Sequence, residues 1–504
     1  MLLARASLLL LVALSSPAGA AAPAAGLDAS AYLESVRSDP ARLERFLREM
    51  PKGGDLHTHL WGVPAAETFL AWGAADGLCI DPGSSATSSA PCAPGTRPMA
   101  DVARDPAAAA VAIDAFSMRN APLPPPRFGH DHFFSTFALF DPVAMRRVGD
   151  AFADAAQRAS RDGTQYLELL HTIQGPATAA LATTVPWTGE IEPAYRAMLP
   201  GIRALASAGS AELDRAFARQ RALLRCDTPM PDPACAVTLR VIQQVVRLGR
   251  PAEVLAALML GAEMTERDGR VLSVDLVAPE DAPPSLAGYR LHMKMLAFLR
   301  GRYPSLRVAL HAGELNGALV PPEELTYHVT EAVRVAGASR IGHGVSVRSE
   351  PGWNELLASM ARDRVAVSIQ LTSNAEILGV SGADHPFRAY LAAGVPLVLS
   401  TDDQGVSRGS HTREFVRAVT EQRLSYAELR RLVRNSVELS FLPGTDLWAV
   451  PGDHSRLAPA CARDLPGVGY PSPTCDALLR ASDRAAEQWR LEARLAAFES
   501  GRWD

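Results

Sequence analysis

Short apolar runs, rich in β-branched residues, alternate along this 504-residue chain with longer segments whose apolar positions recur at helical spacing. Near-continuous apolar runs of this length are typical of parallel strands that are buried on both faces. Their regular alternation with helix-length segments predicts an α/β fold, the (β/α)8 or TIM barrel, whose reactive groups project from the C-terminal ends of the strands. The predicted strands cover residues 54–60, 165–171, 238–246, 271–276, 307–311, 340–343, 366–371 and 396–401.

Two parts of the chain depart from this alternation. The first is an insertion at about residues 76–150, in which the Ser/Pro-rich segment 83–98 and the Pro-rich segment 122–126 interrupt helices. We expect this insertion to form helices and loops over the barrel mouth. The second is a C-terminal extension, residues 451–504, which we expect to pack on the barrel and to end in one amphipathic helix over residues 475–499.

The N-terminus has the composition of a secretory signal peptide. Arg5 precedes an apolar run over residues 8–14, and small residues follow at 18–22. The run is shorter than the ~20 residues that span a bilayer. We therefore predict a signal peptide over residues 1–22 and a mature barrel domain over residues 23–450. The protein is then exported, periplasmic or secreted, and has no stable membrane anchor.

The cysteines agree with export, because they fall into three close pairs. Each pair brackets a loop-like segment, and an oxidising compartment favours disulfides in such places. We predict three local disulfides, with free buried thiols as the alternative, since spacing alone does not determine connectivity. The pairs are Cys79 with Cys92, Cys226 with Cys235, and Cys461 with Cys475.

The charge pattern bears on the kind of partner. The formal net charge is −5, and the chain has no dense run of Lys or Arg. Proteins that bind nucleic acid carry a basic patch or stripe. The arginines here are scattered along helical stretches, as is typical of solvated helix faces. Nucleic acid is therefore not an expected partner.

His57 and His59 form an H-x-H pair at the end of the first predicted strand, after two glycines. Alternation along a strand sends both side chains to the same face, so two imidazoles can converge on one metal ion. Histidine is a good ligand for zinc. Many H-x-H pairs are incidental, so this interpretation depends on further ligands elsewhere in the chain.

His311 ends another predicted strand and is a candidate third ligand, although a structural histidine is the alternative. Glu314 follows where the chain leaves that strand. A carboxyl group there could carry a proton to or from a substrate beside the metal. The alternative is an ordinary helix-start residue that the helix dipole favours.

Asp402 and Asp403 follow the last predicted strand, where adjacent side chains point in different directions. One can ligate the metal while the other faces the substrate, whereas in isolation the pair is commonly a turn or helix N-cap. His343 lies between Gly342 and Gly344. It is either a histidine that approaches a water molecule at the metal or a loop histidine between two turn-forming glycines.

The ordered combination of these motifs resembles the adenosine deaminase family of the amidohydrolase superfamily, and specifically an exported bacterial-type member. The resemblance covers roughly residues 50–445. The matching motifs are Asp55-Leu56-His57-Thr58-His59-Leu60, His311-Ala312-Gly313-Glu314, Arg340-Ile341-Gly342-His343-Gly344, Thr372-Ser373-Asn374, His385-Pro386, Thr401-Asp402-Asp403, and the C-terminal segments 424–429 and 435–441.

The resemblance implies a mechanism with residues in named roles. One zinc ion per chain is held by four ligands, and it lowers the pKa of a water molecule to ~7 so that the water can attack carbon 6 of the purine. His343 orients or deprotonates the water, Glu314 protonates the adjacent ring nitrogen, and Asp403 holds the N7 side of the ring. The implied zinc ligands are His57, His59, His311 and Asp402.

Three positions depart from the family pattern. Trp61 stands where many members have an Asp that meets the ribose. Ala278 stands where a Gly is usual, and we expect its backbone amide to bind the purine with a tighter approach. Gln404 follows the Asp pair in place of the commoner Pro. These departures leave sugar recognition open.

The expected function is therefore hydrolytic deamination of adenosine to inosine, and of deoxyadenosine to deoxyinosine, with release of ammonia. A second hypothesis keeps the chemistry and changes the substrate to another 6-aminopurine or a methylated adenine nucleotide, for which an Arg/Lys cluster near the mouth would be needed. A third is a secreted binding protein without turnover, which the intact ligand set argues against.

Overall fold

The structure is a computed structural model that describes residues 28–121, 123, 128–501 and 503. The predicted signal peptide, residues 1–22, lies outside the described residues. Within them, no helix combines the length and the apolar character that a bilayer crossing demands.

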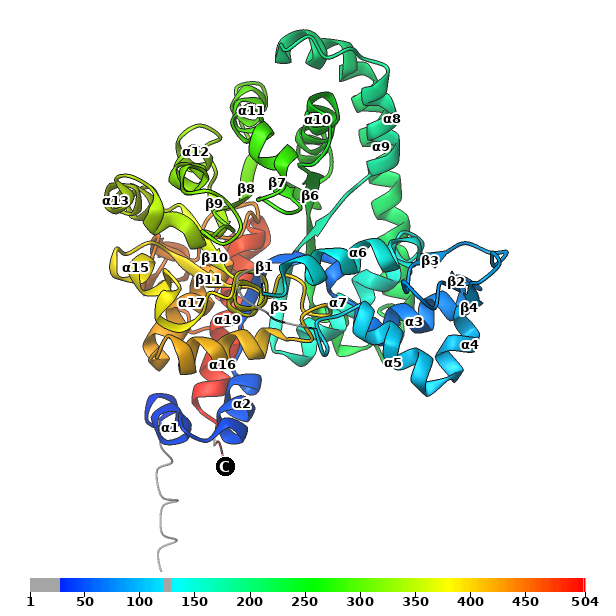
Figure 1. The fold of residues 1–504 in the computed structure, drawn as a ribbon. Coiled ribbons are helices and arrows are strands. Elements are labelled where there is room, and N and C mark those ends of the chain that lie inside the picture. The colour runs from blue at the N-terminus through cyan, green and yellow to red at the C-terminus, as the bar shows by residue number, and fades with distance from the viewer. Residues whose placement is uncertain (1–27, 122, 124–127, 502, 504) are drawn as a thin grey trace, which may run out of the picture.

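Eight parallel strands form one sheet in the order β1-β5-β6-β7-β8-β9-β10-β11 (Figure 1). A parallel bridge between Thr58 and Asp402 joins the two ends of this order, so the sheet curls into a barrel. The predicted (β/α)8 barrel is confirmed. The strands are β1 (Gly53–His59), β5 (Thr164–His171), β6 (Thr238–Val246), β7 (Val271–Val277), β8 (Arg307–Ala312), β9 (Arg340–His343), β10 (Ala366–Ile369) and β11 (Leu397–Leu399).

The last two strands are shorter than predicted. β10 ends at Ile369, because Leu371 already begins helix α14 (Leu371–Leu378). β11 ends at Leu399, and the chain turns at Asp402, whose φ of +59° is in the left-handed region. Both strands therefore end early because the chain turns into the segments that carry the chemistry.

Helices surround the strands, as Figure 1 shows. They include α10 (Pro251–Arg267), α11 (Pro283–Arg300), α12 (His328–Arg334), α13 (Trp353–Asp363), α15 (Phe387–Ala392) and α17 (Tyr426–Glu438). Helix α17 illustrates how the sequence specifies them. Ser425 and Glu428 form a capping box at its start, and Leu429, Leu432 and Val433 form a buried face at helical spacing.

The insertion between β1 and β5 contains more than the predicted helices and loops. It has α3 (Ala66–Ala75), α4 (Met99–Arg104), α5 (Pro106–Ala115), α6 (His130–Ala144) and α7 (Val148–Arg161). It also contains a small antiparallel sheet of β2 (Cys79–Ile80), β3 (Thr87–Ser88) and β4 (Arg97–Pro98). Strands of two residues have no periodicity for a sequence pattern to detect. In Figure 1 this region lies to one side of the barrel.

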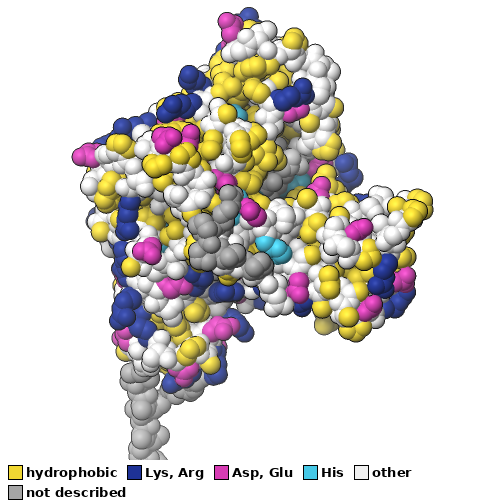
Figure 2. Space-filling view, in the orientation of Figure 1, with side chains coloured by type: hydrophobic (Ala, Val, Ile, Leu, Met, Phe, Trp, Pro, Cys, Tyr) yellow, Lys and Arg dark blue, Asp and Glu magenta, His cyan; other side chains and the backbone are white. Residues whose placement is uncertain are grey.

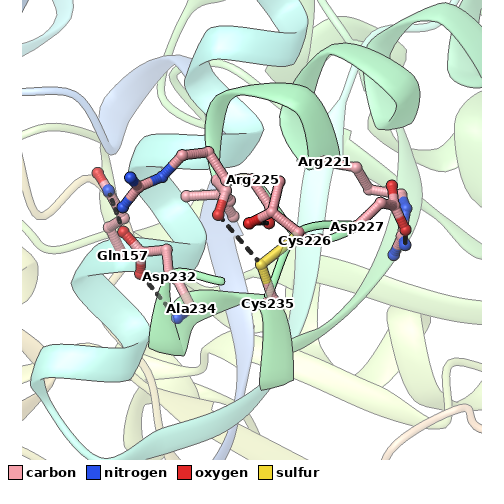
Figure 3. Close-up of a disulfide and its surroundings, with 10 residues drawn as sticks. Gln157, Arg221, Arg225, Cys226, Asp227, Asp232, Ala234 and Cys235 are labelled. Carbon is pink, nitrogen blue, oxygen red and sulfur yellow. Dashed lines mark hydrogen bonds and ion pairs between the residues drawn. A yellow bond between two sulfur atoms is a disulfide. The ribbon is translucent and has the colours of Figure 1, made fainter. Parts of the chain in front are cut away.

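All three predicted disulfides are present, joining Cys79 to Cys92, Cys226 to Cys235, and Cys461 to Cys475. Figure 3 shows the second, just after the long helix α9 (Ile191–Leu223). Beside it, Asp232 accepts hydrogen bonds from the Ala234 backbone N–H at 2.9 Å and from Gln157 Nε2 at 2.8 Å. The closed loop is therefore fixed to helix α7 as well as to α9.

The C-terminal extension ends in two helices, α18 (Pro473–Ala481) and α19 (Asp483–Glu499), so the prediction of one helix over 475–499 is wrong. Ser482 separates them with extended backbone angles, and its side chain accepts a hydrogen bond from the Ala485 backbone N–H. Ser482 is therefore an N-cap residue, and it starts a new helix within a continuous apolar pattern.

Helix α19 covers the N-terminal end of the barrel. The side chain of Glu487 accepts hydrogen bonds from Gln165 Nε2 at 2.8 Å and from Thr238 Oγ1 at 2.6 Å, and these two residues lie at the starts of β5 and β6. Arg490 donates to the Gln165 carbonyl at 2.7 Å. The opposite, C-terminal end of the barrel is left for the candidate site.

Candidate metal centre and active site

The four predicted metal ligands converge at the C-terminal end of the barrel. His57 and His59 come from β1, His311 from β8, and Asp402 from the turn after β11. His311 Nε2 lies 3.0 Å from His57 Nε2 and 3.1 Å from His59 Nε2. Asp402 Oδ1 lies 3.4 Å and 3.3 Å from the same two nitrogens. Side chains that are hundreds of positions apart in sequence thus lie next to one another, with their ligand atoms within 4.8 Å.

Local geometry explains why these atoms meet. His57 and His59 point the same way because they alternate along β1. Asp402 is held against them by backbone hydrogen bonds of 3.0 Å, one from its N–H to the His57 carbonyl and one from the His59 N–H to its carbonyl. Gly342 on β9 leaves room for the His57 ring, because a Cβ at that position would meet the ring. The converging side chains therefore depend on the closure of the barrel.

The donor set fits a zinc ion. Tetrahedral zinc with bonds of ~2.0–2.2 Å keeps its ligand atoms roughly 3.3 Å apart, which agrees with the distances above. Asp402 Oδ1 is buried and has no hydrogen-bond partner. Although burial opposes it, the carboxylates of Asp403 and Asp402 raise the pKa of His59 to about 10. The site thus favours a positive charge at this point, which a metal ion would satisfy.

Two side chains that the sequence analysis missed orient the ligand rings. Gln244 Oε1 on β6 lies 2.8 Å from His59 Nδ1, and Asp275 Oδ1 on β7 lies 2.9 Å from His311 Nδ1. An N–H donated from Nδ1 leaves the lone pair on Nε2, where a metal binds. Both residues sit toward the C-terminal ends of barrel strands, and that position was the signal that could have identified them.

Glu314 lies beside these four side chains, which we call the ligand cluster: His57, His59, His311 and Asp402. It is 6% exposed. Its Oε1 is 3.5 Å from His343 Nδ1. Burial and the neighbouring carboxylates of Asp402 and Glu280 raise its pKa well above the usual value for a glutamate. Glu280 fixes the backbone here by accepting hydrogen bonds from the N–H groups of Gly313 and Glu314 at 3.1 and 2.8 Å. A protonated, held carboxyl group of this kind can act as an acid.

His343 ends β9 with a φ of +65° and is fully buried. Burial lowers the pKa of its ring well below the usual value for histidine, so the ring is neutral. Its Nε2 has no hydrogen-bond partner and lies 4.0 Å from Asp402 Oδ2. Its Nδ1 lies 2.8 Å from Asn374 Nδ2 on α14. One nitrogen is thus engaged by the protein, while the other faces the ligand cluster.

Asp403 and Ala278 both line the cavity in front of the cluster. Burial and the adjacent Asp402 carboxylate raise the pKa of Asp403 to about 8. Ala278 has a φ of +84°, a conformation that favours glycine. A glycine would adopt this φ without strain, whereas the strain at an alanine is of order 1 kcal/mol or more.

The cavity has a volume of about 540 Å³, within the range of small-molecule sites. Its apolar wall comes from α6 and from Trp61 after β1. None of the described residues that line it is a Lys or Arg. On the face shown in Figure 2, Lys and Arg side chains lie mostly at the periphery. The phenylalanines of the wall are Phe133, Phe134, Phe137 and Phe140.

Comparison with known proteins adds to this geometry. The family model described as adenosine deaminase matches residues 228–448. The adenosine deaminase of Serratia proteamaculans is 28% identical over 305 residues, 60% of this chain and 75% of that protein. Residues 228–448 are thus similar to the adenosine deaminase family.

Sequence similarity to two further adenosine deaminases is concentrated in part of the chain. The adenosine deaminases of Shewanella denitrificans and Shewanella loihica are each 34% identical over 154 residues. In both cases the match spans 30% of this chain and 43% of the relative, which is less than half of the relative's length.

Solved structures share the fold at low sequence identity. The N6-methyl-AMP deaminase from Arabidopsis thaliana has a TM-score of 0.51 at 20% identity, over 79% of this chain and 94% of that one. An amidohydrolase from Burkholderia ambifaria, solved with bound Zn, has a TM-score of 0.50 at 18% identity, over 80% and 89%. These similarities show the barrel fold.

Proposed function

We propose that this protein is a zinc-dependent deaminase. It converts adenosine to inosine, and deoxyadenosine to deoxyinosine, with release of ammonia. The observation that carries the proposal is the convergence of His57, His59, His311 and Asp402 beside a protonated Glu314 at the floor of one cavity. Similarity to adenosine deaminases supports the reaction class. When bound, zinc would supply an activated water molecule with a pKa near ~7.

The residues of the chain supply the remaining steps. Glu314 is buried next to the ligand cluster, so it can hydrogen-bond the ring nitrogen beside carbon 6 and transfer its proton there as the ring loses aromaticity. Asp403 has a pKa raised to about 8, and in its protonated form it can donate a hydrogen bond to N7 of the purine. His343 directs Nε2 toward the position of the attacking water. The backbone amide of Ala278, which lines the cavity, can bind the purine.

The cavity wall favours an uncharged substrate over a nucleotide. A phosphate group is normally held by Arg or Lys, and the described lining residues include neither. Asp141, which also lines the cavity, would repel a phosphate. We therefore place a nucleoside ahead of AMP and of methylated AMP as the substrate.

A second candidate substrate is another 6-aminopurine that has an apolar substituent in place of ribose. The phenylalanines of α6 and Trp61 favour it, because they offer aromatic surface where a ribose needs hydrogen-bond partners. Trp61 packs edge-on against His171, with ring centroids 5.8 Å apart, which holds the indole against the cavity.

We also propose that the protein works outside the cytoplasm. The three disulfides support an oxidising compartment. Removal of residues 1–22 is expected to accompany export, and the N-terminal residue of the mature protein secreted by its host would test this.

The deciding experiment follows the absorbance change of deamination with purified, zinc-loaded protein. Adenosine, deoxyadenosine, adenine and AMP are compared, each with and without a chelator. We expect turnover of the nucleosides, little turnover of AMP, and loss of activity on chelation. Turnover of AMP alone would contradict the choice of a nucleoside. Absence of turnover for every 6-aminopurine would favour a binding protein with this fold.

A further inference from the structure

A chain of buried hydrogen bonds runs from the backbone of α15 to His343. The Phe387 backbone N–H donates to His385 Nδ1 at 3.1 Å. His385 Nε2 lies 3.0 Å from Asn374 Oδ1, and Asn374 Nδ2 lies 2.8 Å from His343 Nδ1. Asn374, His385 and His343 are each no more than 1% exposed. Water is thus kept away from these three side chains and the hydrogen bonds that join them.

Chemistry fixes the direction of every bond in this chain. A backbone N–H only donates, so His385 Nδ1 must accept and its proton sits on Nε2. That N–H must meet the carboxamide oxygen of Asn374, which leaves the Asn374 amide group as the donor to His343 Nδ1. Burial and the positive charges of Arg348 and Arg417 lower the pKa of His385 to about 3, in agreement with a neutral ring.

We propose that Asn374 and His385 are positioning residues that set the tautomer of His343, so that its neutral ring carries the proton on Nε2. This inference rests on the proposed function, because it concerns the same site. His343 Nε2 is the nitrogen that faces the ligand cluster and has no partner within the described chain. The ring therefore presents an N–H rather than a lone pair to the reacting water.

The proposal decides between two roles for His343. A lone pair on Nε2 would let the ring take a proton from the water, whereas an N–H on Nε2 donates a hydrogen bond to the water's oxygen and orients it. Glu314 Oε1 lies farther away, 3.5 Å from His343 Nδ1, whose single lone pair already accepts from Asn374 Nδ2 at 2.8 Å. His343 is then an orienting donor, and proton transfer belongs to Glu314.

The direct test is nitrogen NMR of the full chain with 15N-labelled histidine, in zinc-free and zinc-loaded protein. The signal of His343 is identified by its loss in His343→Gln. We expect protonated Nε2 and unprotonated Nδ1 in both forms. A proton on Nδ1 of His343 in the wild-type protein would overturn the proposal. Because this measurement needs no turnover, it is independent of whether the chain deaminates adenosine.

The Asn374→Asp substitution provides a second test of the proposal. A carboxylate cannot donate, so it should draw the His343 proton to Nδ1 while still accepting from His385. We expect the NMR signal to switch tautomer and kcat to fall by about 10- to 100-fold, as for other residues that orient a metal site, with little change in KM. An unchanged tautomer in this variant would also overturn the proposal.

A matched control separates positioning from folding. Asn435 is likewise buried and donates to the Leu397 carbonyl at 3.0 Å, away from the ligand cluster. Asn435→Asp should lower the unfolding temperature and leave the His343 signal and kcat unchanged. If Asn374→Asp does not fold, His385→Phe frees the Asn374 amide to rotate, and we expect mixed His343 tautomers. A single Nε2-protonated state in that variant would contradict the role of His385.

Discussion

At the scale of single residues, the site combines carboxyl groups that differ in charge. Hydrogen bonds with His57 and His59 outweigh burial and hold the pKa of Asp402 well below the usual aspartate value. Glu314 has a carboxyl oxygen within 4.8 Å of an Asp402 oxygen, and burial and neighbouring carboxylates raise its pKa well above the usual glutamate value. One group thus suits a cation and the other can give up a proton, which is the division of labour that hydrolysis beside a metal requires.

Glu314→Gln should preserve zinc binding and abolish most activity. Glutamine has the same shape and can still hydrogen-bond the purine, but it has no proton to transfer. We expect kcat to fall by about 10²- to 10⁴-fold, the usual contribution of a general acid, while the metal content stays at one zinc per chain. Steady-state kinetics and metal analysis of the same preparation measure both quantities.

The control for this substitution is Glu376→Gln. Glu376 is a half-buried glutamate whose pKa is raised by burial, and it lies on α14 outside the ligand cluster. It should retain wild-type kcat. Loss of zinc from Glu314→Gln would show that Glu314 is a ligand and that its assigned role is wrong.

Sequence reasoning proposed the four candidate ligands, which the structure brings together, and missed the residues that orient two of their rings. His57, His59, His311 and Asp402 occur in motifs whose order is specific. Gln244 and Asp275 are common residue types within strands, and only the barrel shows that they meet His59 and His311. Contacts between side chains on neighbouring strands depend on register, which the sequence pattern does not specify at this precision.

At the scale of elements, helix α6 connects the insertion to the barrel mouth. Its phenylalanines line the cavity, and its first residue, His130, bonds to the loop after β7, where Nε2 lies 2.9 Å from Asp281 Oδ1. His130 Nδ1 also lies 2.8 Å from Asp131 Oδ1. This helix therefore forms one side of the site. It is attached there by His130, a side chain that can gain or lose a proton.

Attachment of α6 should weaken as pH rises. Burial opposes it, but hydrogen bonds to Asp281 and Asp131 raise the pKa of His130 above the ordinary histidine value. The pairing thus contributes fully below the unfolded pKa of ~6.5 and is lost as pH rises through the raised folded value. His130→Gln should reduce hydrogen-exchange protection of residues 130–144 at pH 6 and have little effect at pH 9, after correction for intrinsic exchange rates.

His132→Gln is the matched control on the same helix, because His132 Nε2 is 2.9 Å from the Ser117 carbonyl and not from a carboxylate. It should show no such pH dependence. Equal effects of the two substitutions at both pH values would rule out the ion pair as the cause.

Prediction succeeded for elements whose sequence pattern follows from burial. The barrel strands were recognisable because parallel strands, covered on both faces, are apolar along their length. The break at Ser482 was missed because the apolar helical period continues across it, and only the cap hydrogen bond to Ala485 shows where the second helix starts. The small sheet of β2, β3 and β4 was too short to leave a pattern.

At the scale of the whole molecule, the two ends of the barrel have separate tasks. Helix α19 covers the N-terminal end through Glu487 and Arg490, and the ligand cluster lies at the other end. Stability and chemistry are thus supported by different surfaces, as is usual for this fold. The barrel strands run from one of these ends to the other and connect them.

Metal binding should raise the stability of the whole barrel. An ion that binds the folded chain alone stabilises it by RT ln(1 + [L]/Kd), about 4 kcal/mol at a thousandfold excess over Kd. We expect zinc to raise the thermal midpoint of chelator-treated protein and magnesium, which prefers oxygen ligands, to leave it unchanged. His311→Ala should remove the response to zinc. An equal response to both ions would contradict the assigned donor set.

The bridge between Thr58 and Asp402 joins the two ends of the barrel sheet. Asp402 and the two neighbours of Thr58, His57 and His59, are predicted metal ligands. Ring closure and ion loading are therefore two linked equilibria that share the same few atoms. By reciprocity, if the ion tightens this junction, closure of the junction strengthens ion binding by the same free energy.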